Sequence, residues 1–406
     1  MTTVAIIAEY NPPHLGHAYL VKSIRDFFGA DTCVVAIMSG NFVQRGDVAI
    51  CDAYLRGKMA LSLGVDLVLE LPFPYCLGTA EKYATAGVEI ANQLGCIDYL
   101  AFGSESGDLT LIEQVAEFTL SEAYASEIQS VYEDENARAQ SFATLRCNII
   151  SRFLDGATDE FLKSPNNILA IEYLRALKQT NSSIRPWTTK RLGTYHNGTS
   201  DRGIFASASY IRRFIFEQKF DEITHHTTKE TQQQLIEAQN AGHLPARLHA
   251  VGPHLLLSLR NRVGSGACPT ADMDRSLWER VASILPRVGT YDELIFQVKA
   301  KHYTDAHIRR ALLFAYFGIT SADLDTAPSY TKLLAANSVG CSLLKNIKRV
   351  GQIPVLTKTA DYRARLDGVA LRQAEIGFFA DSVFYQCLEK PQSAADVFKK
   401  TPFIGK

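Results

Sequence analysis

Thr3-Val-Ala-Ile-Ile-Ala8, followed by Glu9-Tyr-Asn-Pro-Pro13 and His14-Leu-Gly-His17, is the stretch that decides the fold. Its apolar, β-branched beginning predicts a buried strand. The two prolines end that strand, because proline lacks the backbone N–H that a ladder needs. After the second histidine, apolar residues return at helical spacing, at Ala18, Val21, Ile24 and Phe28. The stretch therefore predicts a strand, a tight turn and a helix.

Two histidines lie three residues apart where this helix begins. A helix N-terminus presents unpaired N–H groups and the positive end of the helix dipole, which together favour phosphate. Gly16 lets a ligand approach the backbone, and two imidazoles can donate to phosphoryl oxygens as charge builds on them. The alternative is that His14 and His17 are ordinary surface residues of a turn, and the pair alone does not decide between these interpretations.

Length and composition predict a globular protein of two domains. The chain has 406 residues, is 47% hydrophobic and 21% charged, and carries a formal net charge of −1. Its apolar N-terminal run has no basic region before it and is too short for a signal peptide or a membrane span. Eight cysteines are scattered without a C-x-x-C pair, which argues against a zinc site or a disulfide framework. We expect a cytoplasmic protein without a structural metal and without membrane contact.

The charges are unevenly distributed along the chain. Residues 216–406 hold 24 Lys and Arg against 19 Asp and Glu, whereas residues 1–215 hold 18 against 24. A basic second half suggests contact with a polyanion. The alternative is an ordinary solvated face, which charge alone does not exclude.

Strands and helices alternate through the first hundred residues. Three further buried strands are predicted at 32–38, 66–71 and 98–102, with helices over 53–63 and 79–94 between them. Strands alternating with helices of this length are typical of βαβ units and a parallel sheet, whose ligand site lies at the carboxyl ends of the strands. The loops expected to face one another there are 11–17, 39–47, 72–78 and 103–107. A further strand at 183–191 contains Pro186 and is expected near a sheet edge.

A second candidate phosphate site occurs at Ser207-Ala-Ser-Tyr-Ile-Arg-Arg213, which opens a helix with two hydroxyl residues and an arginine in its first turns. Hydroxyls, free N–H groups and a guanidinium together can hold phosphate. The alternative is a simple N-cap with a surface arginine. Beyond residue 220 the pattern changes to polar helices, so we predict one domain over 1–217 and a mostly helical, basic domain over 218–406.

Several blocks together carry a resemblance to a known family. They are the opening H-x-G-H turn, Met38-Ser-Gly-Asn-Phe-Val-Gln-Arg-Gly46, Gly64-Val-Asp-Leu-Val-Leu-Glu-Leu-Pro72, Ser164-Pro-Asn-Asn-Ile-Leu169 and Ser207-Ala-Ser-Tyr-Ile-Arg212. The combination resembles the nucleotidylyltransferase branch of the HUP superfamily and, within it, the bacterial tRNA(Met) cytidine acetate ligases. Pro13 and Leu15 depart from that pattern, where a bulky aromatic and a polar residue are expected.

The resemblance implies an α/β fold, with a Rossmann-like HUP parallel sheet covered by helices on both faces and a mostly helical C-terminal domain. It implies a two-step reaction. ATP and acetate give acetyl-adenylate and pyrophosphate, and the N4 amine of the wobble cytidine (C34) of elongator tRNA(Met) then takes the acetyl group, leaving N4-acetylcytidine and AMP. Mg²⁺ is the expected counterion of the triphosphate. The oligomeric state and the residues of the acetate pocket are not indicated.

The resemblance also implies roles for particular residues. His14 and His17 are the expected catalytic residues, as donors to the α-phosphate and the leaving pyrophosphate. The expected ATP contacts are Ile7, Ala8, Glu9, Tyr10, Asn11, Pro12, Pro13, His14, Leu15, Gly16, His17, Ala18, Tyr19, Leu20, Gly103, Asn166, Arg191, Ser209 and Arg212. The expected tRNA surface comprises Lys299, Lys301, Arg309, Arg310, Lys345, Lys348, Arg349, Arg363 and Arg365, with Arg45 beside the anticodon. Asp66 and Glu70 are more often structural than catalytic at such positions.

Three alternatives compete with this interpretation. An adenylyltransferase of cofactor biosynthesis would use the same motifs on a small phosphorylated acceptor, but it needs only the first half of this chain. A class I aminoacyl-tRNA synthetase is disfavoured because no K-M-S-K-S-like loop follows the sheet. A non-catalytic tRNA-binding protein with a decayed nucleotide site is opposed by the intact histidine pair.

Overall fold

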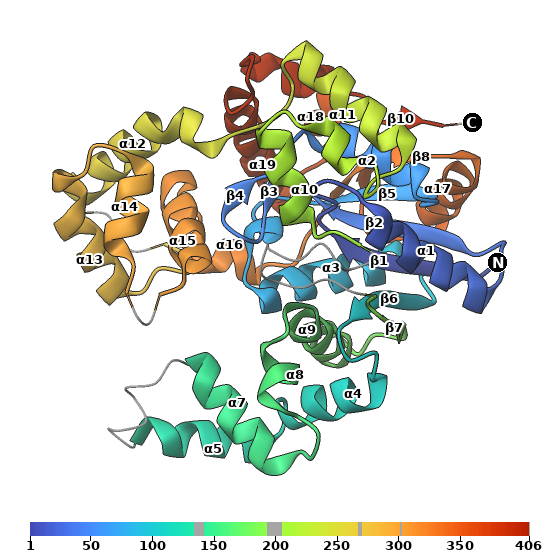
Figure 1. The fold of residues 1–406 in the computed structure, drawn as a ribbon, viewed down its shortest axis with the longest axis horizontal. Coiled ribbons are helices and arrows are strands. Elements are labelled where there is room, and N and C mark those ends of the chain that lie inside the picture. The colour runs from blue at the N-terminus through green and yellow to red at the C-terminus, as the bar shows by residue number, and fades with distance from the viewer. Residues whose placement is uncertain (134–141, 193–204, 267–269, 301–302, 406) are drawn as a thin grey trace.

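The computed structural model describes residues 1–133, 142–192, 205–266, 270–300 and 303–405 (Figure 1). Its centre is one sheet in the order β10-β8-β5-β2-β1-β6-β7, with β9 paired to β8. The strands of the first half are β1 (Thr3–Ala8), β2 (Cys33–Ser39), β5 (Leu67–Leu71), β6 (Tyr99–Ser104) and β7 (Arg185–Lys190). All neighbours among these five are parallel, so the predicted parallel sheet is confirmed.

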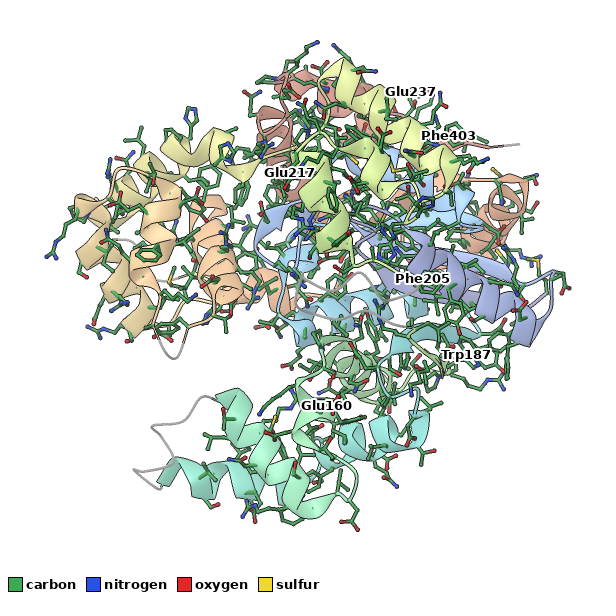
Figure 2. The ribbon with its side chains drawn as sticks, in the orientation of Figure 1. Glu160, Trp187, Phe205, Glu217, Glu237 and Phe403 are labelled. Atoms are coloured by element: carbon green, nitrogen blue, oxygen red, sulfur yellow. The ribbon has the colours of Figure 1, made fainter. Side chains whose placement is uncertain are left out.

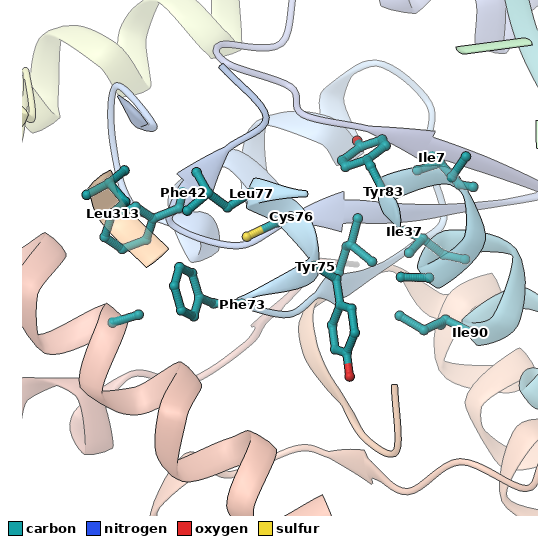
Figure 3. Packing of buried hydrophobic residues seen from close by; sticks show 14 of the residues in the cluster. Ile7, Ile37, Phe42, Phe73, Tyr75, Cys76, Leu77, Tyr83, Ile90 and Leu313 are labelled. Carbon is teal, nitrogen blue, oxygen red and sulfur yellow. The ribbon is translucent and has the colours of Figure 1, made fainter. Parts of the chain in front are cut away.

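Helices cover both faces of this sheet, because successive buried side chains of a strand point to opposite faces. Val4 and Ile6 of β1 belong to the cluster that packs under α1 (Leu15–Phe28) and α2 (Ala53–Ser62). Ala5 and Ile7 face the other side, in the cluster that holds α3 (Ala80–Leu94) and α9 (Pro165–Gln179). In Figure 3, Ile7 and Ile37 lie against the α3 side chains Tyr83 and Ile90. The predicted two-sided covering is confirmed.

Local signals set the ends of these helices. Asp52 caps α2 by accepting a hydrogen bond from the backbone N–H of Leu55, and Thr79 caps α3 in the same way through Lys82. α3 ends at Gly95, whose φ of 69° is a left-handed conformation that glycine adopts readily. These caps place the loops that follow β2 and β5 at the carboxyl edge of the sheet.

The last part of the chain returns to the same sheet, which the sequence did not predict. β8 (Thr331–Ala336) pairs antiparallel with β5, and β9 (Val355–Leu356) and β10 (Phe403–Ile404) each pair parallel with β8. The division at residue 217 stays a prediction, but residues 331–404 contribute strands to the sheet of the first half. The helix of 19 residues, α19 (Gly368–Gln386), packs beside them.

Two groups of helices stand away from the sheet (Figure 1). One follows β6 and comprises α4 (Leu109–Phe118), α5 (Glu122–Glu133), α7 (Phe142–Phe153) and α8 (Asp159–Lys163). The other comprises α12 (Gly252–Gly264), α13 (Arg275–Ile284), α14 (Tyr291–Val298) and α15 (Asp305–Phe317). The short α16 (Ser321–Asp325) follows and returns to the sheet layers, where Asp325 pairs with Lys82 of α3. The remaining elements of the described residues are β3 (Phe42–Val43), β4 (Asp47–Val48), α10 (Ala208–Phe216), α11 (Lys229–Ala241), α17 (Ser338–Val350), α18 (Tyr362–Arg365) and six short 3-10 turns. None of the helices in the described ranges is long and apolar enough to cross a membrane.

Candidate active site

The turn between β1 and α1 is held by side chains from distant parts of the chain. The Asn11 side-chain oxygen accepts a hydrogen bond from the Ile50 backbone N–H at 2.7 Å. The Asn11 carbonyl accepts another from the Arg212 guanidinium at 2.7 Å. Tyr10 is buried and has a φ of 47°, a left-handed conformation uncommon for a tyrosine. The turn is therefore fixed before any ligand binds.

Both histidines are fixed by backbone donors at the start of α1. His14 is the N-cap, and its Nδ1 accepts from the Gly16 backbone N–H at 3.1 Å. The Nδ1 of His17 accepts from the His14 backbone N–H at 3.2 Å. A neutral imidazole that accepts at Nδ1 carries its proton on Nε2. The two rings stack with centroids 3.8 Å apart, so the site presents two Nε2–H donors side by side.

Burial keeps these histidines neutral. It lowers the pKa of His14 to about 3, with further lowering from the nearby Arg191, His226 and Arg212. The pKa of His17 is also held well below its usual range, first by burial and then by His14 and Arg191. The donors are therefore neutral imidazoles at physiological pH, preorganised to stabilise negative charge that develops on a ligand.

Gly16 also makes room for a protein side chain, and its predicted role in ligand approach stays a prediction. A Cβ at this position would lie 2.9 Å from Cε1 of His14, so the glycine makes room for the histidine ring that folds back over it. Gly103 does the same for Arg191, whose Cγ would lie 3.1 Å from such a Cβ. Both glycines therefore shape the site by admitting a protein side chain.

A small cavity of about 30 Å³ adjoins the histidines, and we call it the histidine pocket. It is lined by His14, Gly16, His17, Tyr19, Leu20, Gly103, Thr189, Arg191, Leu192 and Phe205. Seven of these residues were predicted as ATP contacts. Thr189 and Leu192 were not predicted to line this pocket, although they lie within two residues of Arg191. Phe205, whose ring lies 5.7 Å from that of Tyr19, was not predicted either, because it precedes the helix start (Figure 2).

Arg191 brings a positive charge to the histidine pocket. Its Nε is buried and has no hydrogen-bond partner among the described residues, and burial lowers the pKa of the guanidinium. The charge of Glu105 offsets part of the cost of burying this cation, but the Nε donor is left without a hydrogen bond. The arrangement is therefore suited to bind an anionic ligand at this place.

Asn166 lies beside the loop after β6 but its side chain is already engaged. Its Nδ2 donates to Glu105 at 2.7 Å, and the Asn167 backbone N–H donates to the other oxygen of that carboxylate at 2.9 Å. Ile7 also differs from the rest of the predicted set, because its side chain packs in the core against Gly87 of α3. Their ATP contacts stay predictions.

Arg212 borders a second and larger cavity. Arg212 donates to the Ser209 hydroxyl at 3.1 Å, at the start of α10. The cavity, of about 540 Å³, lies between the β3–β4 hairpin, α10 and the beginnings of α14 and α15. We call it the arginine cleft. The acidic and arginine residues that line it are Glu9, Arg45, Asp47, Arg212, Arg247, Asp292, Asp305 and Arg309. Arg212 lines this cleft and also lowers the pKa of His14, so it links the two cavities.

Asp66 and Glu70 serve the fold. Asp66 accepts from the Val34 backbone N–H at 2.8 Å and pairs with Arg25 at 2.9 Å. Glu70 is buried with Lys332 of β8 at 3.0 Å, and Lys332 also pairs with Asp381 of α19 at 2.7 Å. These ion pairs join the late strands to the early ones.

The predicted tRNA surface is scattered in space. Arg309 lies in the arginine cleft, and Arg310 beside it is paired with Asp272 at 2.8 Å. Lys299 is paired with Asp305, and Arg363 with Glu375. The helix α17 carries Lys345, Lys348 and Arg349. It follows β8, which runs antiparallel to β5, so it begins at the amino end of β5. The histidines lie at the opposite, carboxyl edge of the sheet. Arg365 lies on α18, and Lys301 lies outside the described residues.

Comparison with known proteins identifies the family. The family model for HIGH Nucleotidyl Transferase matches residues 1–398. A relative from Acetivibrio thermocellus named tRNA(Met) cytidine acetate ligase is 34% identical over 402 residues, covering 96% of each chain. The chain belongs to the tRNA(Met) cytidine acetate ligase family. The resemblance drawn from the sequence is thereby confirmed.

Other members of the tRNA(Met) cytidine acetate ligase family agree with this assignment. A relative of that name from Caldanaerobacter subterraneus subsp. tengcongensis is 35% identical, covering 95% of each chain. The crystal structure of Thermotoga maritima TmcAL bound with alpha-thio ATP covers both chains completely, with a TM-score of 0.88 and 26% identity. The apo form of the same protein matches with a TM-score of 0.90 and 28% identity. The predicted fold class is confirmed over the whole chain.

Proposed function

We propose that this protein activates acetate with ATP and transfers the acetyl group to N4 of the wobble cytidine of elongator tRNA(Met). The family membership and the names of the relatives support the overall reaction. The observation that carries the first step is the convergence of two neutral Nε2–H donors and the buried guanidinium of Arg191, whose Nε has no hydrogen-bond partner among the described residues, on one cavity at the N-terminus of α1.

In the first step, an acetate oxygen attacks the α-phosphorus of ATP and pyrophosphate leaves. Negative charge builds on the phosphoryl oxygens of the transition state, where fixed donors stabilise it most. His14 and His17 supply those donors. Because both Nδ1 atoms already accept backbone hydrogen bonds, neither ring needs to reorient during the reaction.

The other predicted contacts complete this proposal. Arg191 binds the polyphosphate as its counter-ion, and Ser209 and Arg212 hold the distal phosphates from α10. Residues 7–20, Gly103 and Asn166 surround the nucleoside. The N-terminus of α1 adds the helix dipole. Mg²⁺ would be the counterion of the triphosphate. The cytoplasm is the proposed location, because the reaction uses ATP and tRNA.

Acetate-dependent exchange of pyrophosphate into ATP tests the first step. The wild type is expected to exchange only when acetate is present, and His17→Asn to exchange at least about a hundredfold more slowly, since removing one such donor typically costs this much. His225→Asn, which replaces an exposed histidine, is the matched control. Exchange that requires a phosphorylated acceptor in place of acetate would indicate a cofactor adenylyltransferase. No exchange with any acid would indicate a tRNA-binding protein.

A further inference from the structure

The arginine cleft is formed by segments from both halves of the chain. It is lined by residues from 43–50, from α10, from 246–249 and from the beginnings of α14 and α15. Its volume of about 540 Å³ lies within the range of small-ligand sites, roughly 300–1,000 Å³. The first reaction step does not account for most of this cleft.

One buried hydroxyl and two partly exposed charged groups of the cleft are not engaged with one another, and a buried hydroxyl normally has a hydrogen-bond partner. The hydroxyl of Tyr291 is buried without a hydrogen bond, although the residue is only 3% exposed. Asp47 uses one carboxylate oxygen to accept from its neighbour Val48 and forms no ion pair in the described part of the chain. Arg309 makes no hydrogen bond or ion pair with any described residue. A hydroxyl, a carboxylate and a guanidinium therefore line the same cavity without a hydrogen bond or ion pair between them in the described part of the chain.

The cleft is rigid where these groups meet. A Cβ at Gly46, in the β3–β4 turn, would lie 2.4 Å from Cβ of Arg309, so the hairpin is pressed against α15. Arg310 continues this contact by pairing with Asp272 and by donating to the Gln44 carbonyl at 3.4 Å. This packing fixes Asp47 opposite Arg309 before a ligand binds.

A flat surface and a link to the first site complete the cleft. The guanidinium of Arg247 lies 4.5 Å from the ring centre of Phe216, and both residues line the cleft. Aromatic rings and arginine planes of this kind stack with unpaired RNA bases. Arg212 connects the cleft to the histidines, because its charge acts on both Asp47 and His14.

We propose that the arginine cleft binds the acceptor as a single unstacked cytidine of an RNA loop, with the Asp47 carboxylate accepting from its N4 amine. This inference rests on the proposed function and adds where and how the base is recognised. Carboxylates are the natural acceptors for the cytosine N4–H₂ group. The base stacks on Phe216 and Arg247, the Tyr291 hydroxyl donates to a base acceptor, and Arg309 and Arg45 pair with flanking phosphates.

Asp47 also has a defined part in the transfer. The N4 lone pair attacks the acetyl carbon of acetyl-adenylate, the new C–N bond forms, and the C–O bond to the phosphate breaks. AMP leaves with that electron pair. The proton that N4 loses passes to the carboxylate of Asp47, which already accepts a hydrogen bond from the same amine.

Binding of two anticodon stem-loops, identical except for cytidine or uridine at the wobble position, tests the proposal without ATP or acetate. Uridine offers O4, an acceptor, where cytidine offers a donor, so the wild type is expected to prefer cytidine by about tenfold or more. Asp47→Asn is expected to bring the preference below about twofold, because an amide can both donate and accept. The exposed Asp155→Asn is the matched control and keeps the wild-type preference.

Two further variants keep the proposal testable if Asp47→Asn folds poorly. Tyr291→Phe removes one hydroxyl and is expected to weaken binding of the cytidine loop several-fold. Arg309→Gln is expected to weaken binding of both loops equally and to lower the slope of log affinity against log salt by about one unit.

The proposal would be overturned by a wild type that does not prefer the cytidine loop. It would also be overturned by an unchanged preference in Asp47→Asn together with an unchanged affinity in Tyr291→Phe. Failure of the proposed function would appear separately, as a wild type that binds the cytidine loop but does not exchange pyrophosphate with acetate.

Discussion

Replacing His14 by asparagine removes one buried titratable group while keeping an acceptor at the N-cap of α1. The asparagine side-chain oxygen can accept from the Gly16 backbone N–H as Nδ1 of His14 does. The folded protein holds the pKa of His14 at about 3, below its usual value of 6.5, chiefly because the ring is buried. The variant should therefore have a free energy of unfolding close to that of the wild type at neutral pH. The dependence of that free energy on pH should change much more.

The sign and size of the effect follow from proton linkage. As the pH falls below 6.5, the unfolded chain binds a proton at His14 that the folded chain excludes until the pH approaches 3. The free energy of unfolding of the wild type therefore falls with falling pH across this window. Between about pH 7 and about pH 5, His14 alone lowers it by about 2 kcal/mol. In His14→Asn, the free energy of unfolding should not show this contribution to its fall at low pH.

Urea unfolding at several pH values in that window measures the difference directly. The wild type should lose about 2 kcal/mol more than His14→Asn. The control is His225→Asn, in which an exposed histidine is replaced. Equal pH dependence in the wild type and His14→Asn would refute the conclusion that His14 is a buried, neutral donor.

Three further predictions concern the ion pairs, the pocket and the packing. Lys332→Met leaves Glu70 and Asp381 buried without their cation and should lower the free energy of unfolding by about 3–5 kcal/mol; urea midpoints equal to those of the exposed control Lys345→Met would contradict this. Arg191→Gln should weaken ATP binding by about tenfold or more in calorimetry, and unchanged affinity would exclude it from the site. Gly340→Ala should strongly destabilise, because the new Cβ would lie 2.0 Å from the Asp66 carbonyl oxygen, whereas Gly264→Ala meets nothing within 4 Å; similar melting temperatures for both would contradict the packing.

The first half of the sheet was predictable because its signals are local. The strand predicted at 66–71 is β5 at 67–71, and the helix predicted over 53–63 is α2 at 53–62. Apolar runs, caps and terminating glycines lie within each segment and need no distant partner. Even Pro186 was interpreted correctly, because β7 is the edge strand.

β8 was not predictable in the same way. Its run Thr331-Lys-Leu-Leu-Ala-Ala336 contains a lysine, and all six residues are buried. A buried lysine is stable only when paired, and the partners of Lys332 lie far away in sequence at Glu70 and Asp381. No local pattern contains that information.

The site was predictable in its motifs but only partly in its geometry. The sequence placed His14, His17 and Arg212 at helix starts, where the structure has them. The Nε2–H form of both histidines depends on backbone hydrogen bonds that only coordinates reveal. The arginine cleft joins Asp47 to Tyr291 and Arg309 across more than two hundred residues, so spacing along the chain does not indicate it.

Transfer of labelled acetate to tRNA tests the central claim most directly. The protein is incubated with ATP, radioactive acetate and elongator tRNA(Met), and the tRNA is digested to nucleosides. The account predicts label in N4-acetylcytidine from the wobble position, formed with one AMP per acetyl group, and none when the wobble cytidine is replaced by uridine. Label-free tRNA with acetate-independent release of AMP, or label at other positions, would contradict it.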